Sequence, residues 1–315
     1  MNNYEFFKKY LPIWQCYNKS GNIGAMICRV TQRLDGLKVD YRIDSHGNVF
    51  AGDFTAERPC MVAHLDSVHD TPIKKVSYKK GVISSPEGIG GDDKCGIIAA
   101  LEIIEKHADV NALFCADEEI GCVGARAVDA AMLDKVKYFI EIDRRGNDDI
   151  VYRASGVQIA SVDFQKALKP YADKYKYSQV WGAVTDVVSL APKAKSCAIN
   201  LSAGYYYPHT TQEVVVVSDL RKSISFASAV VSNVKDSFEY KEYTYHGQHR
   251  NYHQRRSAED VVFESLEEIV SWMSTDTTLA WWEVREMQNA LQQAFDLGFA
   301  ECLALFPQSS QEQPS

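Results

Sequence analysis

Short apolar runs alternate with segments of helical periodicity along most of this chain, and this order of elements limits the fold. The apolar runs predict strands at residues 59–66, 110–119, 136–146 and 195–207. Helical periodicity predicts helices at residues 92–107, 122–132, 163–175 and 218–234. Strands and helices that follow one another in this way form α/β domains. We therefore expect a three-layer α/β/α fold around a central mixed, mainly parallel sheet.

Local signals add detail to this outline. Residues 3–34 predict two helices separated by the break "NKSGN". Residues 39–52 and 76–85 alternate around "HGN" and "KKG", which predicts two hairpins. Pro170 falls inside the helix predicted at 163–175, where the lost backbone donor can break a helix.

The character of the sequence changes near residue 238, which divides the chain into parts. Residues 1–238 form the α/β domain, and its length and apolar content are sufficient for one large core. Residues 239–256 are polar and predict a linker, and residues 257–306 carry apolar stripes that predict a helical C-terminal extension. Residues 307–315, "PQSSQEQPS", predict a disordered tail.

The C-terminal part carries two features that could serve binding. His246, His249 and His253 could bind a metal, but the arginines around them favour a solvated linker. Trp281 and Trp282 are adjacent, so they cannot share one face of a helix. We expect the extension to be an interaction or dimer element that supports a homo-oligomer.

Charge and cysteine pattern exclude several classes of protein. The net charge of −8 argues against nucleic acid or an anionic membrane as the main partner. No apolar stretch is long enough for a membrane span, and the N-terminus has no signal-peptide pattern. The cysteines show no CxxC pair and lie mostly in apolar runs, which favours reduced thiols. We therefore expect a cytoplasmic protein.

Polar groups follow the apolar runs where the carboxyl ends of strands would form a crevice. Each has an ordinary explanation, because lone histidines are often structural and acids favour helix starts and N-caps. Together they form a cluster of acids with few cations, which two divalent metals would neutralise. The groups are His64, Asp66, Asp92, Asp93, Asp117, Glu118, Glu119, Glu141, Asp143 and His209.

The spacing of these groups suits metal-assisted hydrolysis. His64 and Asp66 are two apart in an extended segment, so Asp66 could hold the far ring nitrogen of a metal-bound His64. Glu118 and Glu119 are adjacent and cannot point the same way. One of them can bind a metal while the other acts as general base.

Five motifs, "AHLDSV", "GGDDKCG", "DEEIG", "EID" and "YYYPHTTQE", occur in this order over residues 63–213. In order and spacing they resemble the co-catalytic di-zinc exopeptidases, a clan of aminopeptidases, peptidase T-like tripeptidases and carboxypeptidases. The resemblance implies two Zn²⁺ per chain, and the same ligand types also suit Mn²⁺ or Co²⁺. It implies a shared ligand, Asp92, with one site completed by His64 and Asp143 and the other by Glu119 and His209.

The resemblance also implies catalytic roles. Glu118 would be the general base that activates a metal-bridging water, and Asp66 would orient His64. A tyrosine of the "GYYYPH" segment could assist the oxyanion, which makes Tyr205, Tyr206 and Tyr207 candidates. Lidded members of the clan insert a domain between the last two ligands, whereas here His209 follows Asp143 by 66 residues. We therefore expect a compact form without a lid.

Substrate recognition leaves alternatives open. Asp186, next to Thr185, could anchor a free α-amino group, which would favour an aminopeptidase, or it could only cap a helix beginning near Val187. The leading hypothesis is an aminopeptidase acting on short peptides. The alternatives are a deacylase or amidase on small N-acyl substrates, a catalytically silent binding protein, and a protein with a single structural metal.

Overall fold

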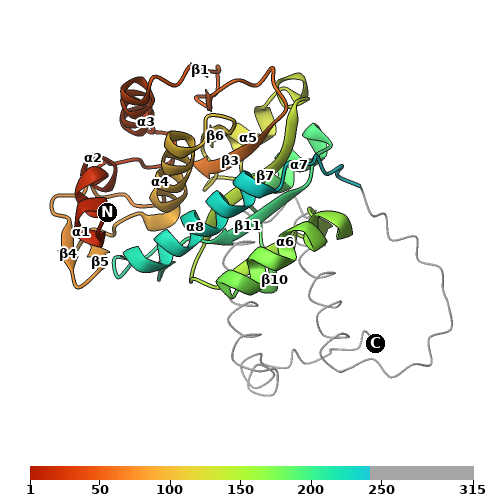
Figure 1. The fold of residues 1–315 in the computed structure, drawn as a ribbon. Helices are drawn as coiled ribbons and strands as arrows, with labels where there is room; N and C mark the ends of the chain where they lie inside the picture. Colours follow the sequence, from red (N-terminus) through yellow and green to blue (C-terminus); the bar gives the residue numbers. More distant parts are fainter. Residues whose placement is uncertain (242–315) are drawn as a thin grey trace, which may run out of the picture. The chain divides into compact units, whose positions relative to one another are not determined.

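A nine-stranded sheet forms the centre of the computed structural model, which describes residues 1–241 (Figure 1). Its strand order is β1-β2-β6-β3-β7-β11-β8-β10, with the short β9 (Val157–Gln158) paired to β8. The predictions for the rest of the linker, the C-terminal helices and the tail lie outside the described residues. So do those for His246, His249, His253, Trp281 and Trp282.

Four parallel strands form the middle of the sheet. They are β6 (Asn111–Cys115), β3 (Arg58–His64), β7 (Val136–Arg144) and β11 (Ala198–Ser202). Both faces of this region are buried, which explains why the strands are continuous apolar runs in the sequence. The prediction of a mixed, mainly parallel sheet is confirmed.

Antiparallel pairs lie toward both edges of the sheet. On one side, β1 (Tyr41–Ile43) and β2 (Val49–Ala51) form the predicted hairpin, and β2 pairs with β6. On the other side, β8 (Asp149–Ala154) runs antiparallel to β11 and parallel to β10 (Ser178–Gly182). The sequence analysis missed β8 and β10. In β10 most residues are exposed or half-buried, so no apolar run marks it as a strand.

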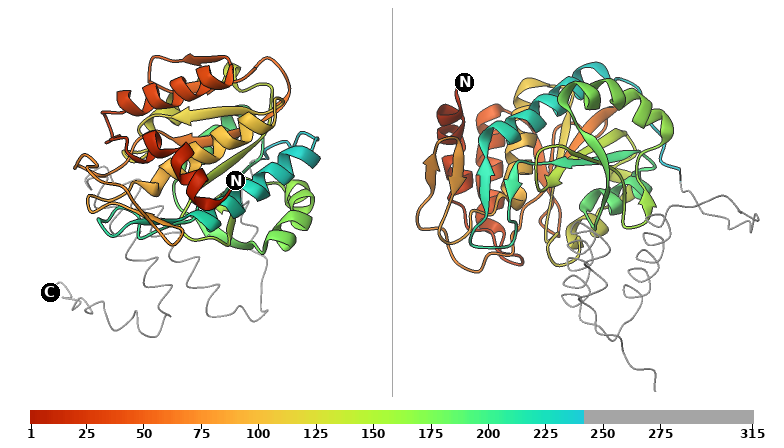
Figure 2. Two further views of the ribbon diagram at one scale, coloured as in Figure 1. Left: turned by 60° about the vertical axis from the view of Figure 1, so that its left-hand side comes forward. Right: turned by 90° about the horizontal axis from the view of Figure 1, so that it is seen from below.

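Helices cover both faces of the sheet, as Figures 1 and 2 show. One face is covered by α4 (Gly91–Lys106), α6 (Val162–Tyr175) and α8 (Val217–Asn233), beside which α3 (Gly24–Leu37) packs. The other face is covered by α5 (Val123–Ala127) and α7 (Asp186–Ala194). The predicted three-layer α/β/α architecture is therefore confirmed.

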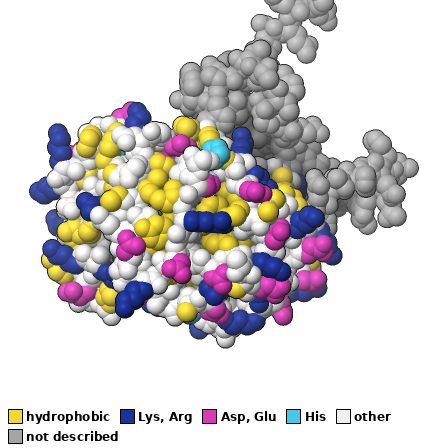
Figure 3. All heavy atoms as spheres, turned by 90° about the horizontal axis from the view of Figure 1, so that it is seen from above, with side chains coloured by type: hydrophobic (Ala, Val, Ile, Leu, Met, Phe, Trp, Pro, Cys, Tyr) yellow, Lys and Arg dark blue, Asp and Glu magenta, His cyan; other side chains and the backbone are white. Residues whose placement is uncertain are grey.

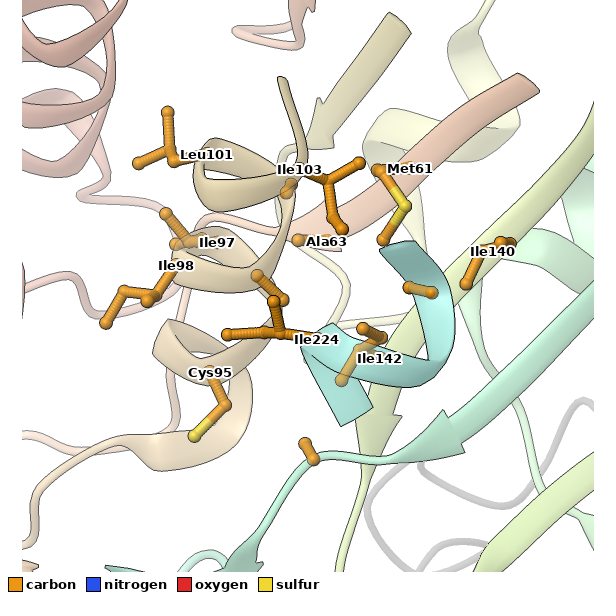
Figure 4. Packing of buried hydrophobic residues seen from close by; sticks show 14 of the residues in the cluster. Met61, Ala63, Cys95, Ile97, Ile98, Leu101, Ile103, Ile140, Ile142 and Ile224 are labelled. Atoms are coloured by element: carbon orange, nitrogen blue, oxygen red, sulfur yellow. The ribbon is translucent and has the colours of Figure 1, made fainter. Parts of the chain in front are cut away.

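A large part of the core lies between α4 and the sheet (Figure 4). Met61 and Ala63 of β3 face α4, while Cys60 and Val62 face the opposite core. Side chains of α4 such as Ile97 fill the space above β3. Burial of α4 along almost its whole length holds its first turn firmly against the carboxyl end of β3.

Smaller elements flank this core. Two short helices, α1 (Asn3–Lys9) and α2 (Leu11–Trp14), precede α3. A second, four-stranded sheet joins the predicted hairpin of β4 (Ser77–Lys79) and β5 (Val82–Ser84) to β13 (Val214–Val216) and β12 (Tyr205–Tyr206). This sheet brings the segment after residue 204 next to the segment before α4.

One helix prediction and one strand prediction need correction, and a second helix prediction is confirmed without a break. The helix expected at 122–132 is the short α5 followed by a 3₁₀ turn, Ala130–Met132, because Val128 leaves the helical conformation. The helix expected at 163–175 is unbroken, although Pro170 lies inside α6. The strand expected at 195–207 is two strands, β11 and β12, separated by Ala203 and a Gly204 with positive φ.

On the face shown in Figure 3, basic and acidic side chains are interspersed, and hydrophobic side chains form small groups. No helix among residues 1–241 combines the length and apolar character needed to cross a bilayer. The seven cysteines of this region are all free, and six of them are buried, with Cys28 exposed.

Candidate active site

The five predicted metal ligands lie together at the carboxyl end of the parallel strands. Each comes from a different element, so only the folded sheet can assemble them. His64 ends β3, Glu119 follows β6, Asp143 lies near the end of β7, Asp92 lies in the first turn of α4, and His209 follows β12.

Asp92 stands between the two histidines. Its Oδ1 lies 2.9 Å from Nε2 of His64, and its Oδ2 lies 3.1 Å from Nε2 of His209. One carboxylate thus presents a different oxygen to each imidazole. This is the arrangement that a carboxylate bridging two cations requires.

Two groups of potential ligands share Asp92. The first adds His64 and Asp143, with 3.7 Å between Nε2 of His64 and Oδ1 of Asp143. The second adds His209 and Glu119, with 3.0 Å between Nε2 of His209 and Oε1 of Glu119. Within each group the ligand atoms lie within 4.8 Å of one another. Imidazole and carboxylate are the ligands that zinc prefers at such sites, so the residues fit two divalent ions.

The electrostatics of the cluster also fit cations. Burial opposes a charged His64, but the carboxylates of Asp143, Asp66 and Asp92 outweigh it and raise its pKa well above the usual value. His209 is only partly buried, and this burial also opposes its charge, yet Asp92 and Glu119 raise its pKa to about 10. Buried carboxylates therefore demand positive charge here, which protons or metal ions can supply.

Asp66 organises the site from behind. Its Oδ1 lies 3.3 Å from Nδ1 of His64 and accepts a 2.9 Å hydrogen bond from the Glu118 backbone N–H. Its Oδ2 accepts from the Glu119 N–H at 3.1 Å and from the Ser20 hydroxyl at 2.8 Å. One carboxylate thus fixes the ring of His64 and the backbone of both glutamates. The predicted contact between His64 and Asp66 is present.

Glu118 is almost fully buried beside the ligand groups. Burial raises the pKa of its carboxyl group well above the usual value, and Glu119 and Asp143 add to this effect. Its Oε1 accepts a weak hydrogen bond from the Cys122 thiol at 3.6 Å. A carboxylate with a raised pKa can accept and return a proton near neutral pH.

The two acids of "GGDDK" have different partners. Asp92 faces the histidines, whereas Asp93 accepts hydrogen bonds from the Gly96 N–H at 2.7 Å and from the His64 N–H at 3.2 Å. Asp93 therefore caps the regular part of α4 and ties it to β3. The N-cap explanation of this motif thus applies to Asp93, whereas Asp92 belongs to the groups of potential metal ligands.

The three candidate tyrosines have separate environments. Tyr205 is buried, and its hydroxyl donates a 3.1 Å hydrogen bond to Oδ1 of Asp143. The Tyr206 hydroxyl donates to Asp219, away from the predicted ligands, and Tyr207 is 65% exposed. Tyr205 is thus the one that contacts a predicted ligand.

Thr185 and Asp186 lie beneath the site at the start of α7. The Thr185 hydroxyl donates to Glu141 and accepts from Nδ2 of Asn200, which also donates to the Asp143 carbonyl oxygen. Asp186 is fully buried, and burial raises its pKa to about 7. The N-cap of α7 is Thr185, and no side-chain cap bond forms there.

Sequence reasoning missed three residues that support the ligands. Ser20 contacts Asp66, which is 46 positions away along the chain, and Asn200 contacts Asp143, which is 57 positions away. No local sequence pattern indicates contacts at such separations. Glu213 was available in the sequence as the last residue of "YYYPHTTQE". Its carboxylate accepts from the Asp92 N–H at 3.0 Å.

Known proteins resemble this chain in sequence and in fold. Residues 52–264 match the sequence profile of peptidase family M28. A search of curated protein sequences found no match.

Solved structures also share the fold. The aminopeptidase PepT from Bacillus cereus is 16% identical, with a TM-score of 0.62 over 73% of this chain and 98% of that one. A tripeptidase from Staphylococcus aureus is 16% identical, with a TM-score of 0.63 over 74% and 99% of the two chains. The TET1 peptidase of Pyrococcus horikoshii is 18% identical, with a TM-score of 0.57 over 73% and 99%.

Proposed function

Because the chain belongs to peptidase family M28, we propose that it is a metal-dependent aminopeptidase that removes residues from the N-terminus of short peptides. The family match includes all five predicted ligands and Glu118. The observation that carries the proposal is the position of Asp92, whose two oxygens face two different histidines.

Two zinc ions would be held by the two groups that share Asp92. His64 and Asp143 would complete one site, and Glu119 and His209 the other. Bound at these positions, the ions would polarise the scissile carbonyl and stabilise its developing negative charge. Mn²⁺ or Co²⁺ would suit the same ligands.

The chain's own residues would handle the proton. Glu118 takes a proton from the attacking water and delivers it to the leaving amine. Its raised pKa lets one carboxyl group perform both transfers. Asp66 contacts both the Glu118 backbone and the ring of His64. The proposed base and one proposed metal ligand are therefore held in fixed positions relative to each other.

The choice of an aminopeptidase rests on the family and on the named structural neighbours. It does not rest on Asp186, because that carboxylate is fully buried and a substrate ammonium would have to reach it through the core. A deacylase acting on small N-acyl substrates would use the same metal chemistry and differ only in the groups that bind the substrate end.

The test combines metal counting with a substrate panel. We expect elemental analysis of the purified full chain to give about two metals per chain, as the co-catalytic mechanism requires. We expect dipeptides with a free amino group to be cleaved faster than their N-acetylated counterparts. Faster cleavage of the acetylated set would identify a deacylase, and a metal-free, inactive chain would contradict the proposal.

We also propose a cytoplasmic location, with which the free buried thiols agree.

Residues 257–306 are proposed as a dimer element. The Pyrococcus horikoshii peptidase is described as assembling into a tetrahedron or a large octahedral shell. If the extension of this chain joins subunits, a variant lacking residues 257–315 should contain fewer subunits per particle, as calculated from the mass measured by light scattering. An unchanged number of subunits would rule out this role.

A further inference from the structure

Glu213 receives three hydrogen bonds at a buried position below the ligand groups. Its Oε1 accepts from the Asp92 N–H at 3.0 Å, and its Oε2 accepts from the Gly90 N–H at 2.8 Å. Its Oε2 also lies 2.8 Å from Nε2 of His69, which can donate as the neutral tautomer. The side chain of Glu213 has no exposed surface, so water cannot replace these bonds.

The turn that carries these N–H groups packs closely against its neighbours. A Cβ added to Gly88 would lie 2.2 Å from the His69 ring. A Cβ added to Gly91 would lie 2.7 Å from the side chain of Val215 and 2.8 Å from that of Tyr205. Glycine at these positions allows the turn to approach the second sheet closely enough for its backbone to reach Glu213.

Glu213 also belongs to the segment that carries His209. Its backbone N–H donates to the Thr210 carbonyl at 3.2 Å, and β13 begins at the next residue. The same residue therefore anchors the His209 loop through its backbone and the Asp92 turn through its side chain.

The charge of Glu213 has a buried counterpart. Lys94 is buried two residues after Asp92, and its ammonium attracts the Glu213 carboxylate electrostatically. The Lys94 ammonium donates to the carbonyls of Ile89 at 2.9 Å and Trp14 at 3.3 Å. Charge and hydrogen bonds thus hold the turn on both sides.

We propose that Glu213 is a positioning residue that sets the carboxylate of Asp92 between His64 and His209 by binding the backbone N–H groups of the Asp92 turn. The inference rests on the proposed metal-dependent function but concerns metal binding rather than the reaction. Partners that orient ligands in this way commonly change metal affinity about 10- to 100-fold when they are lost.

The decisive variant is Glu213→Gln, which keeps the volume and leaves no cavity. Its amide has one acceptor oxygen, so the NH₂ group must face either the Asp92 N–H or the Gly90 N–H and His69. We expect zinc affinity, measured on the full chain by competition with a chelating dye, to fall by roughly 10- to 100-fold. Affinity within about twofold of wild type in a folded variant would overturn the proposal.

Gln212→Ala is the matched control, because Gln212 is the exposed neighbour on the same loop. It should bind zinc like wild type, and a loss equal to that of Glu213→Gln would also contradict the proposal. Circular dichroism of the metal-free variants confirms that they are folded.

Should Glu213→Gln fail to fold, His69→Asn replaces it as the test. The shorter side chain removes one of the three bonds from a partly exposed position and should weaken zinc binding in the same direction by a smaller factor. Unchanged affinity would then overturn the proposal. The zinc-binding measurement contains no substrate, so it remains valid even if the proposed reaction is wrong. A wild-type chain that binds no metal would instead refute the proposed function itself.

Discussion

Glu118→Gln should reduce peptide hydrolysis by about 10²- to 10⁴-fold, the usual contribution of a general base, while the metal content stays the same. The substitution keeps the shape of the side chain and removes only its ability to take up a proton. Glu118 is buried, and its backbone N–H is held by a hydrogen bond to Asp66. The glutamine should therefore occupy the same place. Initial rates on a free-amino dipeptide and elemental analysis of the same sample measure both quantities.

Glu119→Gln is the matched comparison, because it changes the adjacent acid in the same way. Glu119 belongs to the group with Asp92 and His209, so this variant should lose metal as well as activity. The contrast between adjacent residues separates the base from the ligand. If Glu118→Gln loses metal and Glu119→Gln retains it, the two roles have been assigned in the wrong order.

Asp92→Asn should lose both metals or bind them far more weakly, and activity should fall by about 10³-fold or more. Asp92 belongs both to the group with His64 and Asp143 and to the group with Glu119 and His209. Its loss therefore affects both proposed metal positions. An amide nitrogen cannot ligate as a carboxylate oxygen does. The rate estimate follows because Lewis-acid stabilisation contributes several kcal/mol, and each ~1.4 kcal/mol is a factor of ten.

Asp93→Asn provides the control, since Asp93 is the adjacent acid and is also buried, but it accepts structural hydrogen bonds from the backbone N–H groups of Gly96 and His64. An asparagine can satisfy only one of those donors with its oxygen. We expect a loss of stability of about 1–3 kcal/mol, visible in denaturant unfolding, with the metal content retained. An Asp92→Asn protein that keeps two metals, or an Asp93→Asn protein that loses them, would contradict the division of roles.

The sequence predicted the central part of the fold well because that part obeys one simple rule. Strands buried on both faces must be continuous apolar runs, and β3, β6 and β7 are such runs. The rule fails at the edge. β10 is exposed along much of its length, and the four strands of the second sheet are two or three residues long. Short or exposed strands carry no periodicity that distinguishes them from loops, unless a turn signal marks a hairpin, as it does for β1–β2 and β4–β5.

The sequence by itself determined which residue types stand at the strand ends, and therefore the ligands and base we propose. In a parallel sheet the carboxyl ends of the strands share one edge, so order along the chain becomes proximity in space. Tertiary structure alone decided the supporting contacts of Ser20, Asn200 and Glu213. It also decided that Tyr205 reaches Asp143 and that Asp186 is buried. These contacts join residues whose separation along the chain follows no period, so only the packed elements bring them together.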